Sequence, residues 1–263
     1  MSDAADPAVI TEVAGAVATL TLARPARRNV LNAESMGLLL DGLRAAAADD
    51  AVRVVVLTAI GPVFCAGADM SGAAAQPADF ASSGPSMLVE VLKTLLEYPK
   101  PTIARVQGNT FGGGMGLVAA CDLAVAVETA AFAFSEVRVG VAPAVVSVPC
   151  LRVMSPRSVA EFCLTGERFD AQRAVEAGLL TAAVPEPGLD AIVSGWVEQL
   201  RLGGPLSMRA TRDVLSHVPN LSLDDAFAYA VRVSSSMFGG PEAVEGMAAF
   251  RDRRPPGWVQ PPA

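Results

Sequence analysis

The sequence predicts an α/β fold in which a core of strands and helices carries a helical C-terminal region. Short apolar segments, typical of strands buried in a sheet, alternate with helix-like segments in the first half of the chain. Beyond Pro143 the hydrophobic pattern is almost wholly helical. The alternation predicts the core, and the helical remainder predicts a subdomain attached to it.

The first elements are predicted from turn and capping signals. Residues 9–24 alternate apolar and polar side chains around a central glycine, which indicates a β-hairpin. Asn32 is suited to cap a helix that runs to about Asp49, and a buried strand follows at residues 52–58.

The rest of the chain is predicted from the same kinds of signal. Loops are expected at residues 59–69 and 71–86, the second of them mobile, because Gly, Pro, Ala and Ser are frequent there. Further elements are expected as a helix to about residue 98, strands at 101–106, 122–127 and 131–135, and helices at 117–120, 171–178, 189–202, 205–216, 223–237 and 245–254.

Composition excludes several classes of protein. Of 263 residues, 52% are apolar and 18% charged, which favours surface buried in an oligomer or a buried acyl-type ligand. No run of about 18 uncharged apolar residues appears, so no membrane span is expected. The acidic residues 1–7 do not resemble a secretory signal. The net charge of −7 argues against nucleic-acid binding.

Cysteine and histidine usage indicates a reducing compartment and no metal site. The four cysteines stand apart in mainly apolar contexts, which predicts reduced core residues and a cytoplasmic location. The single histidine, His217, argues against a histidine-rich metal site and against a Ser-His-Asp triad. It ends a helical pattern, so a helix cap or a surface position is expected.

The most informative segment is a glycine cluster at residues 107–116. It follows the strand expected at 101–106, leads into a helix, and has four glycines among residues 112–116. Bare N–H groups at a helix N-terminus suit an anion, or an oxygen that gains negative charge during a reaction. Close packing of helix against sheet is the alternative for any one of these glycines.

Three segments together resemble the crotonase (enoyl-CoA hydratase/isomerase) family. They are the loop Phe64–Asp69, the glycine cluster, and the segment Phe134–Pro143. The resemblance extends to residues 24–32 and 245–250, so it covers nearly the whole chain.

The resemblance implies an architecture and an assembly. It implies a spiral of ββα units over residues 1–195 and a C-terminal helical trimerisation region over residues 196–263. The implied assembly is a homotrimer or a dimer of trimers.

The resemblance also assigns candidate site residues. The backbone N–H groups of Ala68 and Gly113 would form an oxyanion hole for a thioester carbonyl, which suits the charge that an enolate places on one oxygen. Ala66 to Ala68 would meet the adenine or pantetheine portion of an acyl-CoA. No metal and no separate cofactor is implied, since coenzyme A arrives as part of the substrate.

Four further side chains are candidates for contact with coenzyme A. Arg24, Phe250 and Arg253 match family positions that make such contacts, the last two across a subunit boundary. For both arginines the alternative is a solvated surface charge. Asp69 lies in the same loop as Ala68, and its favoured interpretation is an N-cap for the segment that follows.

One position departs from the two-carboxylate members of the family. Their glutamate two residues after the glycine run is replaced by Gly116, whereas their second glutamate is present as Glu136. Glu136 is therefore the candidate general acid/base. Loss of the other carboxylate can lower acid–base catalysis by about 10²–10⁴-fold.

The expected reaction is addition of water to the double bond of a 2-enoyl-CoA thioester through an enolate. In motif the chain is similar to one-glutamate members such as the methylglutaconyl-CoA hydratases. The alternatives are a Δ3,Δ2-enoyl-CoA isomerase with Glu136 as its sole acid/base, and a weakly active acyl-CoA-binding protein.

Arg138 has the same strand parity as Glu136, so the two would share a face if the strand continued that far. Contact with a substrate carboxylate, such as that of a glutaconyl group, is one hypothesis. A solvated charge or an ion pair with Glu136 is the favoured alternative.

Other classes of function fit less well. A dinucleotide-binding G-x-G-x-x-G that starts at Gly112 would end on Leu117, which is not glycine. The G-x-S-x-G of a serine hydrolase is absent from the sequence. A pure interaction scaffold would not need loops of the oxyanion type.

Overall fold

The computed structural model describes residues 7–69 and 77–259, which form two β-sheets surrounded by helices. The larger sheet consists, in chain order, of β1 (Val9–Ala14), β2 (Val17–Leu22), β3 (Val54–Ala59), β5 (Thr102–Val106), β7 (Leu123–Val127) and β10 (Ala182–Val184). Neighbours in the sheet follow the same order; β1 and β2 are antiparallel and the other pairs are parallel.

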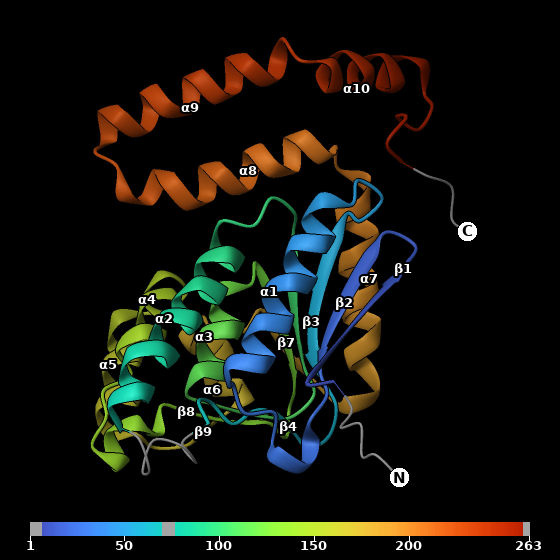
Figure 1. The fold of residues 1–263 in the computed structure, drawn as a ribbon. Coiled ribbons are helices and arrows are strands. Elements are labelled where there is room, and N and C mark those ends of the chain that lie inside the picture. The colour runs from blue at the N-terminus through green and yellow to red at the C-terminus, as the bar shows by residue number, and fades with distance from the viewer. Residues whose placement is uncertain (1–6, 70–76, 260–263) are drawn as a thin grey trace.

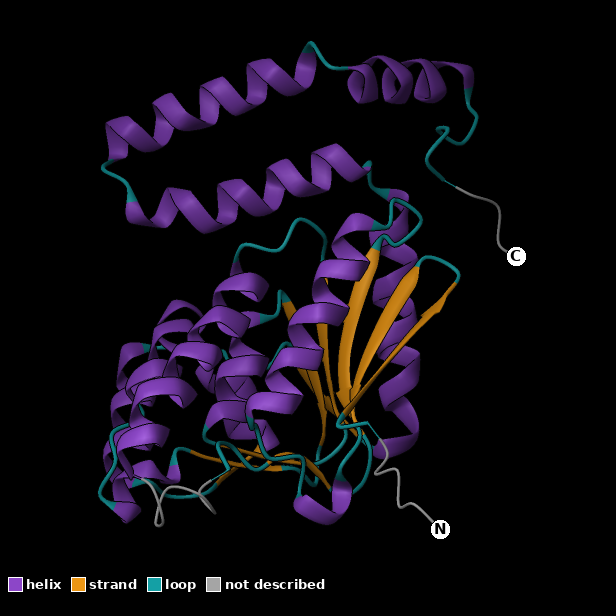
Figure 2. Cartoon of the chain, viewed as in Figure 1, coloured by secondary structure: helices purple, strands orange, loops and turns teal. Residues whose placement is uncertain are grey.

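The smaller sheet crosses one end of the larger one (Figure 2). It consists of β4 (Val63–Cys65), β6 (Asn109–Phe111), β8 (Ala131–Ala133) and β9 (Phe169–Asp170). The first three strands are parallel and β9 runs antiparallel to β8. A strand of the larger sheet thus passes repeatedly into a strand of the smaller one, which is the expected spiral of paired strands.

The helices cover both faces of the larger sheet (Figure 1). α1 and α3 lie on one face, with α2 beside them, and α7 lies on the other. The described helices are α1 (Ala33–Ala48), α2 (Pro77–Leu96), α3 (Gly113–Ala120), α4 (Ala144–Val153), α5 (Pro156–Thr165), α6 (Ala171–Ala177), α7 (Leu189–Leu202), α8 (Pro205–His217), α9 (Leu223–Phe238) and α10 (Pro241–Asp252). Short 3₁₀ turns are η1 (Pro25–Arg27), η2 (Ser135–Val139), η3 (Glu186–Gly188) and η4 (Val218–Asn220).

The elements with strong local signals are confirmed. The hairpin pairs β1 with β2, and Asn32 caps α1 through a reciprocal capping box with Ser35. The strands expected at residues 52–58, 101–106 and 122–127 are β3, β5 and β7. His217 is the last residue of α8, as expected, and its Nδ1 lies 2.7 Å from the carbonyl oxygen of Asp213.

The predicted loop over residues 71–86 is wrong for its second half. Helix α2 begins at Pro77 and includes Pro85, so residues 77–86 are helical; residues 71–76 lie outside the described residues. The buried side chains Leu88, Val91, Leu92 and Leu95 form one apolar stripe of this helix. Residues 77–86 extend this helix toward its N-terminus in spite of the poor helix propensity of the Ser-Gly-Pro segment.

Shorter differences concern β8 and β9 of the smaller sheet and β10 of the larger sheet. β8 ends at Ala133, and η2 replaces the end of the strand expected to reach Ser135. The condition for the parity argument about Arg138 is therefore not met. The two-residue β9 and three-residue β10 carry too little pattern to be seen in the sequence.

The C-terminal helices α8, α9 and α10 stand apart from the sheet layers (Figure 1). No described residue of α8 or α9 is buried. Arg212 of α8 joins this arm to the core: its Nε donates to both carboxylate oxygens of Asp122, at 2.9 and 2.8 Å. Asp122 in turn accepts from the backbone N–H and hydroxyl of Thr102. The boundary predicted between residues 195 and 196 falls within α7 and stays a prediction.

In the part of the chain that the structure describes, no helix is long and apolar enough to cross a bilayer. All four cysteines are free, and Cys65, Cys121 and Cys150 are buried. Burial raises the pKa of the Cys65 thiol to about 12, so it is neutral in the core.

Candidate active site

The loop at Gly67 and the glycine cluster touch backbone to backbone. Gly67 has a φ of +88°, and a Cβ at this position would lie 3.2 Å from the carbonyl oxygen of Phe111 and 3.3 Å from the amide nitrogen of Gly113. Only glycine permits both the left-handed conformation and this approach. The two loops of the predicted oxyanion hole are therefore in contact at Gly67. The sequence interpretation gave Gly67 no role of its own.

Two backbone amides at this junction are unused within the described residues. Gly113 is the first residue of α3, so its N–H has no acceptor within the helix. Hydrogen bonds on either side of Ala68, from Leu31 N–H to the Gly67 carbonyl and from Asp69 N–H to the Leu31 carbonyl, hold that loop in place. No hydrogen bond from Ala68 N–H to a described residue is present. Two free amides on adjoining loops suit an oxygen that becomes negatively charged.

Glu136 lies at the same junction, in η2. Its Oε1 is 3.3 Å from the position of a Cβ on Gly112, which has a φ of +50°. Its Oε2 is buried and has no hydrogen-bond partner among the described residues. Burial raises the pKa of Glu136, because desolvation disfavours the charged carboxylate. A half-buried carboxyl with one buried, unpartnered oxygen and a raised pKa, beside bare backbone, is a candidate acid/base.

No second carboxylate stands at Gly116. A Cβ there would meet Cδ1 and Cδ2 of Leu92, at 3.2 and 3.3 Å, and Cγ1 of Val146 at 3.3 Å. The position is enclosed by methyl groups of α2 and α4, a feature that no local sequence signal could have revealed.

Arg24 and Asp69 already have partners in the structure. The guanidinium of Arg24 makes two hydrogen bonds to the carboxylate of Glu34, at 2.8 and 2.7 Å. Asp69 lies 3.4 Å from Nη2 of Arg27. The N-cap role predicted for Asp69 would involve the segment after it, which lies outside the described residues. Ala66 N–H donates to the carbonyl of Arg28, which joins the Ala66 loop to the segment that follows Arg24.

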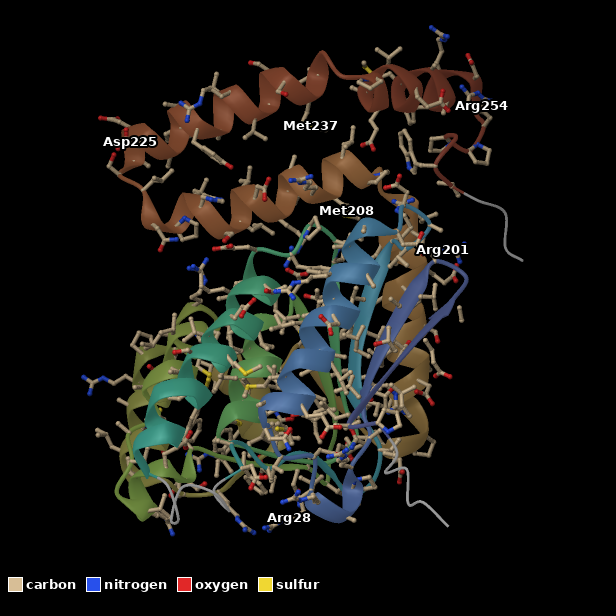
Figure 3. The ribbon with its side chains drawn as sticks, in the orientation of Figure 1. Arg28, Arg201, Met208, Asp225, Met237 and Arg254 are labelled. Carbon is tan, nitrogen blue, oxygen red and sulfur yellow. The ribbon has the colours of Figure 1, made fainter. Side chains whose placement is uncertain are left out.

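Phe250 and Arg253 are not brought to these residues within one chain. They lie at the end of α10, where Phe250 is 87% exposed and Arg253 forms the left-handed C-cap. Figure 3 shows Arg28 and Arg254 at opposite ends of the molecule. A contact of Phe250 or Arg253 with coenzyme A across a subunit boundary stays a prediction.

Arg138 makes no ion pair with any residue that the structure describes. Its Nε donates to the carbonyl of Thr165 at 3.3 Å, and its stem packs beside Gly166. The ion pair with Glu136 considered from the sequence is therefore not formed, and Arg138 is an exposed cation two residues from the candidate acid/base.

No metal site emerges either. Among residues 7–69 and 77–259, no group of three or more His, Cys, Asp or Glu side chains is arranged to hold an ion. The candidate chemistry at this junction rests on amides and one carboxyl.

Comparisons with known proteins identify the family. The family model described as enoyl-CoA hydratase/isomerase matches residues 12–261. A Thermus thermophilus relative, which carries a provisional enoyl-CoA hydratase name, is 34% identical over 92% of this chain and 97% of its own. The carnitinyl-CoA dehydratase of Escherichia coli K12 is 30% identical over 93% of this chain and 95% of its own.

Solved structures agree with the sequence relatives. An enoyl-CoA hydratase from Mycobacterium smegmatis superposes with a TM-score of 0.92 at 30% identity. The match covers 97% of this chain and 100% of the M. smegmatis chain. This likeness confirms the predicted crotonase fold, with its two sheets and C-terminal helices. The chain belongs to the enoyl-CoA hydratase/isomerase family and is an enzyme of that family.

Proposed function

We propose that this enzyme is an enoyl-CoA hydratase, which adds water across the double bond of a 2-enoyl-CoA thioester. The observation that carries the proposal is the Glu136 carboxyl, with Oε2 buried and unpartnered among the described residues and Oε1 against the glycine cluster. The unused amides of Ala68 and Gly113 support it, as do the hydratase names of the relatives from T. thermophilus and M. smegmatis.

In the proposed mechanism the thioester carbonyl accepts hydrogen bonds from the N–H groups of Ala68 and Gly113. Water adds its oxygen to C3 while negative charge moves onto the thioester oxygen, where one such donor contributes about 10²–10³-fold to kcat. Glu136 accepts the proton that water loses and delivers a proton to C2. The carboxyl ends the cycle ionised, as it began, so a single residue suffices for both transfers.

The coenzyme A portion is proposed to lie along Ala66–Asp69 and near Arg24. The guanidinium of Arg24 is oriented by Glu34, whose side chain is 48% exposed. A phosphate of coenzyme A would have to compete with Glu34 for this cation. Phe250 and Arg253 are proposed to complete the site from a neighbouring subunit.

Two separate apolar surfaces support the proposed homotrimer or dimer of trimers. One lies on the arm of α8 to α10 and includes Leu215, Leu223, Phe227, Val231, Phe238, Val244 and Phe250. The other lies on η2, α4 and α5 and includes Val139, Val148, Leu151 and Leu164. Exposed patches of this kind mark interaction surfaces, and two different patches on one chain suit a closed ring of subunits.

A second candidate function is Δ3,Δ2-enoyl-CoA isomerisation. The observation in its favour is the apolar enclosure of Gly116, where two-carboxylate hydratases would hold water. Isomerisation needs only one group to move a proton between two carbons, and Glu136 can serve that step alone. A weakly active acyl-CoA-binding protein is the third possibility.

The protein is proposed to be cytoplasmic, because its four cysteines are free and three of them are buried.

A spectrophotometric panel at the conjugated enoyl-thioester band tests the proposal. Hydration predicts loss of absorbance with crotonyl-CoA and with methylglutaconyl-CoA, and no change with a 3-enoyl-CoA. Isomerisation predicts a gain with the 3-enoyl-CoA and no loss with crotonyl-CoA. No change with any of the three, together with retention on immobilised coenzyme A, would leave only the binding protein.

A further inference from the structure

Methyl groups fill the space beside Gly116. The three atoms nearest to a Cβ on this residue belong to Leu92 and Val146, at 3.2 to 3.3 Å. Leu92 is 2% exposed on α2 and Val146 is 3% exposed on α4, so both are held in the core. A side chain larger than hydrogen at residue 116 therefore requires one of them to move.

One face of α4 packs against Gly116 and the residue before it. Val146 and Cys150 are four residues apart and lie on one face of the helix. The Cys150 thiol lies 3.9 Å from the carbonyl oxygen of Met115, the residue before Gly116. Oε1 of Glu136 lies 3.3 Å from the position of a Cβ on Gly112, the N-cap of α3, and Gly116 follows about one turn further along that helix. The wall beside Gly116 and the carboxyl of Glu136 thus belong to one neighbourhood.

We propose that Leu92 and Val146 are specificity-determining residues of the enoyl-CoA site. They occupy the place from which a second carboxylate would act, and so they leave Glu136 as the sole carboxyl for proton transfer. This inference rests on the proposed function. It adds that the packing of α2 and α4, and not the identity of residue 116 alone, leaves no room for a second carboxylate.

The consequence is that Gly116→Glu alone does not create a two-carboxylate site. The new side chain meets Leu92 and Val146, so we expect a lower Tm and no gain in crotonyl-CoA hydration. Room made by Leu92→Ala removes that obstacle. We expect Leu92→Ala/Gly116→Glu to hydrate crotonyl-CoA at least about tenfold faster than its neutral match, Leu92→Ala/Gly116→Gln. Its pH–rate profile should also gain one ionisation that the glutamine variant lacks.

A second matched pair keeps the test valid if the double variants fold poorly. Leu92→Glu brings a carboxylate from α2 to the same place while Gly116 is retained, and Leu92→Gln is its neutral match. The charged member should be the faster hydratase of the two. Equal rates within both pairs would overturn the proposal, as would a Gly116→Glu enzyme with wild-type Tm and faster hydration.

A stability measurement separates this inference from the proposed function. Gly116→Ala should raise Tm more in a Leu92→Ala background than in the wild type, because alanine favours the helix only where its methyl has room. Equal changes in the two backgrounds would overturn the packing claim. A wild-type enzyme that turns over neither crotonyl-CoA nor a 3-enoyl-CoA would instead overturn the proposed function and leave the Tm result to stand by itself.

Discussion

The carboxyl of Glu136 lies directly against the backbone of Gly112: a Cβ on residue 112 would stand 3.3 Å from Oε1 and 3.7 Å from the carboxyl carbon. Gly112, the N-cap of α3, therefore does more than begin a helix. Its backbone contacts the candidate acid/base, while the N–H of the next residue, Gly113, is available as a donor in the same turn. Acid/base and amide donor are positioned by one short backbone segment.

Glu136→Gln should lower turnover of the enoyl-CoA substrate by about 10²–10⁴-fold, because a carboxamide cannot act as a general base or general acid near neutral pH. Binding of the CoA ester should stay near normal, since glutamine keeps the shape of glutamate. Progress curves at the enoyl-thioester band and titration calorimetry measure the two effects. Glu128→Gln, at an exposed turn, is the matched control and should behave as wild type. Full activity in the Glu136 variant would overturn its assignment.

The acid limb of the pH–rate profile should lie above the ordinary glutamate value of 4.5, since burial raises the pKa of Glu136. The protonated carboxyl of Glu136 stabilises the folded state relative to the ionised carboxylate. This contribution to the free energy of unfolding is fully present below pH 4.5 and is lost as the pH rises through the raised pKa of the folded state. Burial raises the pKa values of the Cys150 and Cys163 thiols, the latter to about 11, so both thiols stay neutral in this window.

The corresponding measurement is Tm against pH for the wild type and Glu136→Gln. The two curves should coincide at low pH and separate at neutral pH, with the glutamine variant the more stable. A glutamine variant that is less stable at neutral pH would show that the carboxylate has a favourable partner.

Gly67→Ala should lower kcat by about 10²-fold, because its methyl would press on Phe111 and Gly113 and displace the amides. It also carries the left-handed backbone penalty of about 1–2 kcal/mol. Gly15→Ala is the matched control: its φ is +57° and a Cβ there has nothing within 4 Å. Both variants should lose stability, measured by denaturant unfolding, and only the first should lose activity. Similar activity losses would mean that close approach at Gly67 is unimportant.

Arg138→Ala should reduce kcat/KM for a dicarboxylic enoyl-CoA about tenfold more than for crotonyl-CoA, as expected for loss of a charge-assisted hydrogen bond to carboxylate. Arg138 has no ion pair among the described residues that would compete for it. Arg157→Ala, another exposed arginine, serves as the control. Equal losses on both substrates would remove Arg138 from substrate recognition.

Phe227→Asp should dissociate the proposed oligomer. Phe227 is 65% exposed on α9, and a buried, unpaired carboxylate at an interface is strongly unfavourable. Light scattering should then give the mass of a single chain. Val13→Asp, on a β1 residue that is 53% exposed, should keep the wild-type mass. An unchanged mass for the Phe227 variant would place the interface elsewhere.

Local signals in the sequence were sufficient for much of the fold. The alternation at residues 9–24 predicted the first hairpin, and Asn32 predicted the start of α1, because turns and caps depend on neighbouring residues. The sequence interpretation missed α2 from Pro77 to Ser86, because the Pro, Gly and Ser residues that predict a loop there lie within this helix.

The site divided in the same way. The resemblance to the crotonase family implied that the loops of Ala68, Gly113 and Glu136 belong together, and the structure brings them into contact through Gly67 and Gly112. The enclosure of Gly116 by Leu92 and Val146 depends on how α2 and α4 pack. Arg138 forms no ion pair with a described residue and donates instead to the carbonyl of Thr165, which lies 27 residues further along the chain. Neither feature has a local pattern in the sequence.

The link from Arg212 to Asp122 has a consequence for how the proposed oligomer would assemble. Asp122 is held by Thr102, and Arg212 also donates to the carbonyl of Leu95, so α8 leaves the core in a set direction. An arm that is oriented before encounter loses less conformational freedom when it docks. Arg212→Ala should therefore slow reassembly after dilution more than it weakens the interface contacts themselves, because the arm would have to search for its orientation at each encounter.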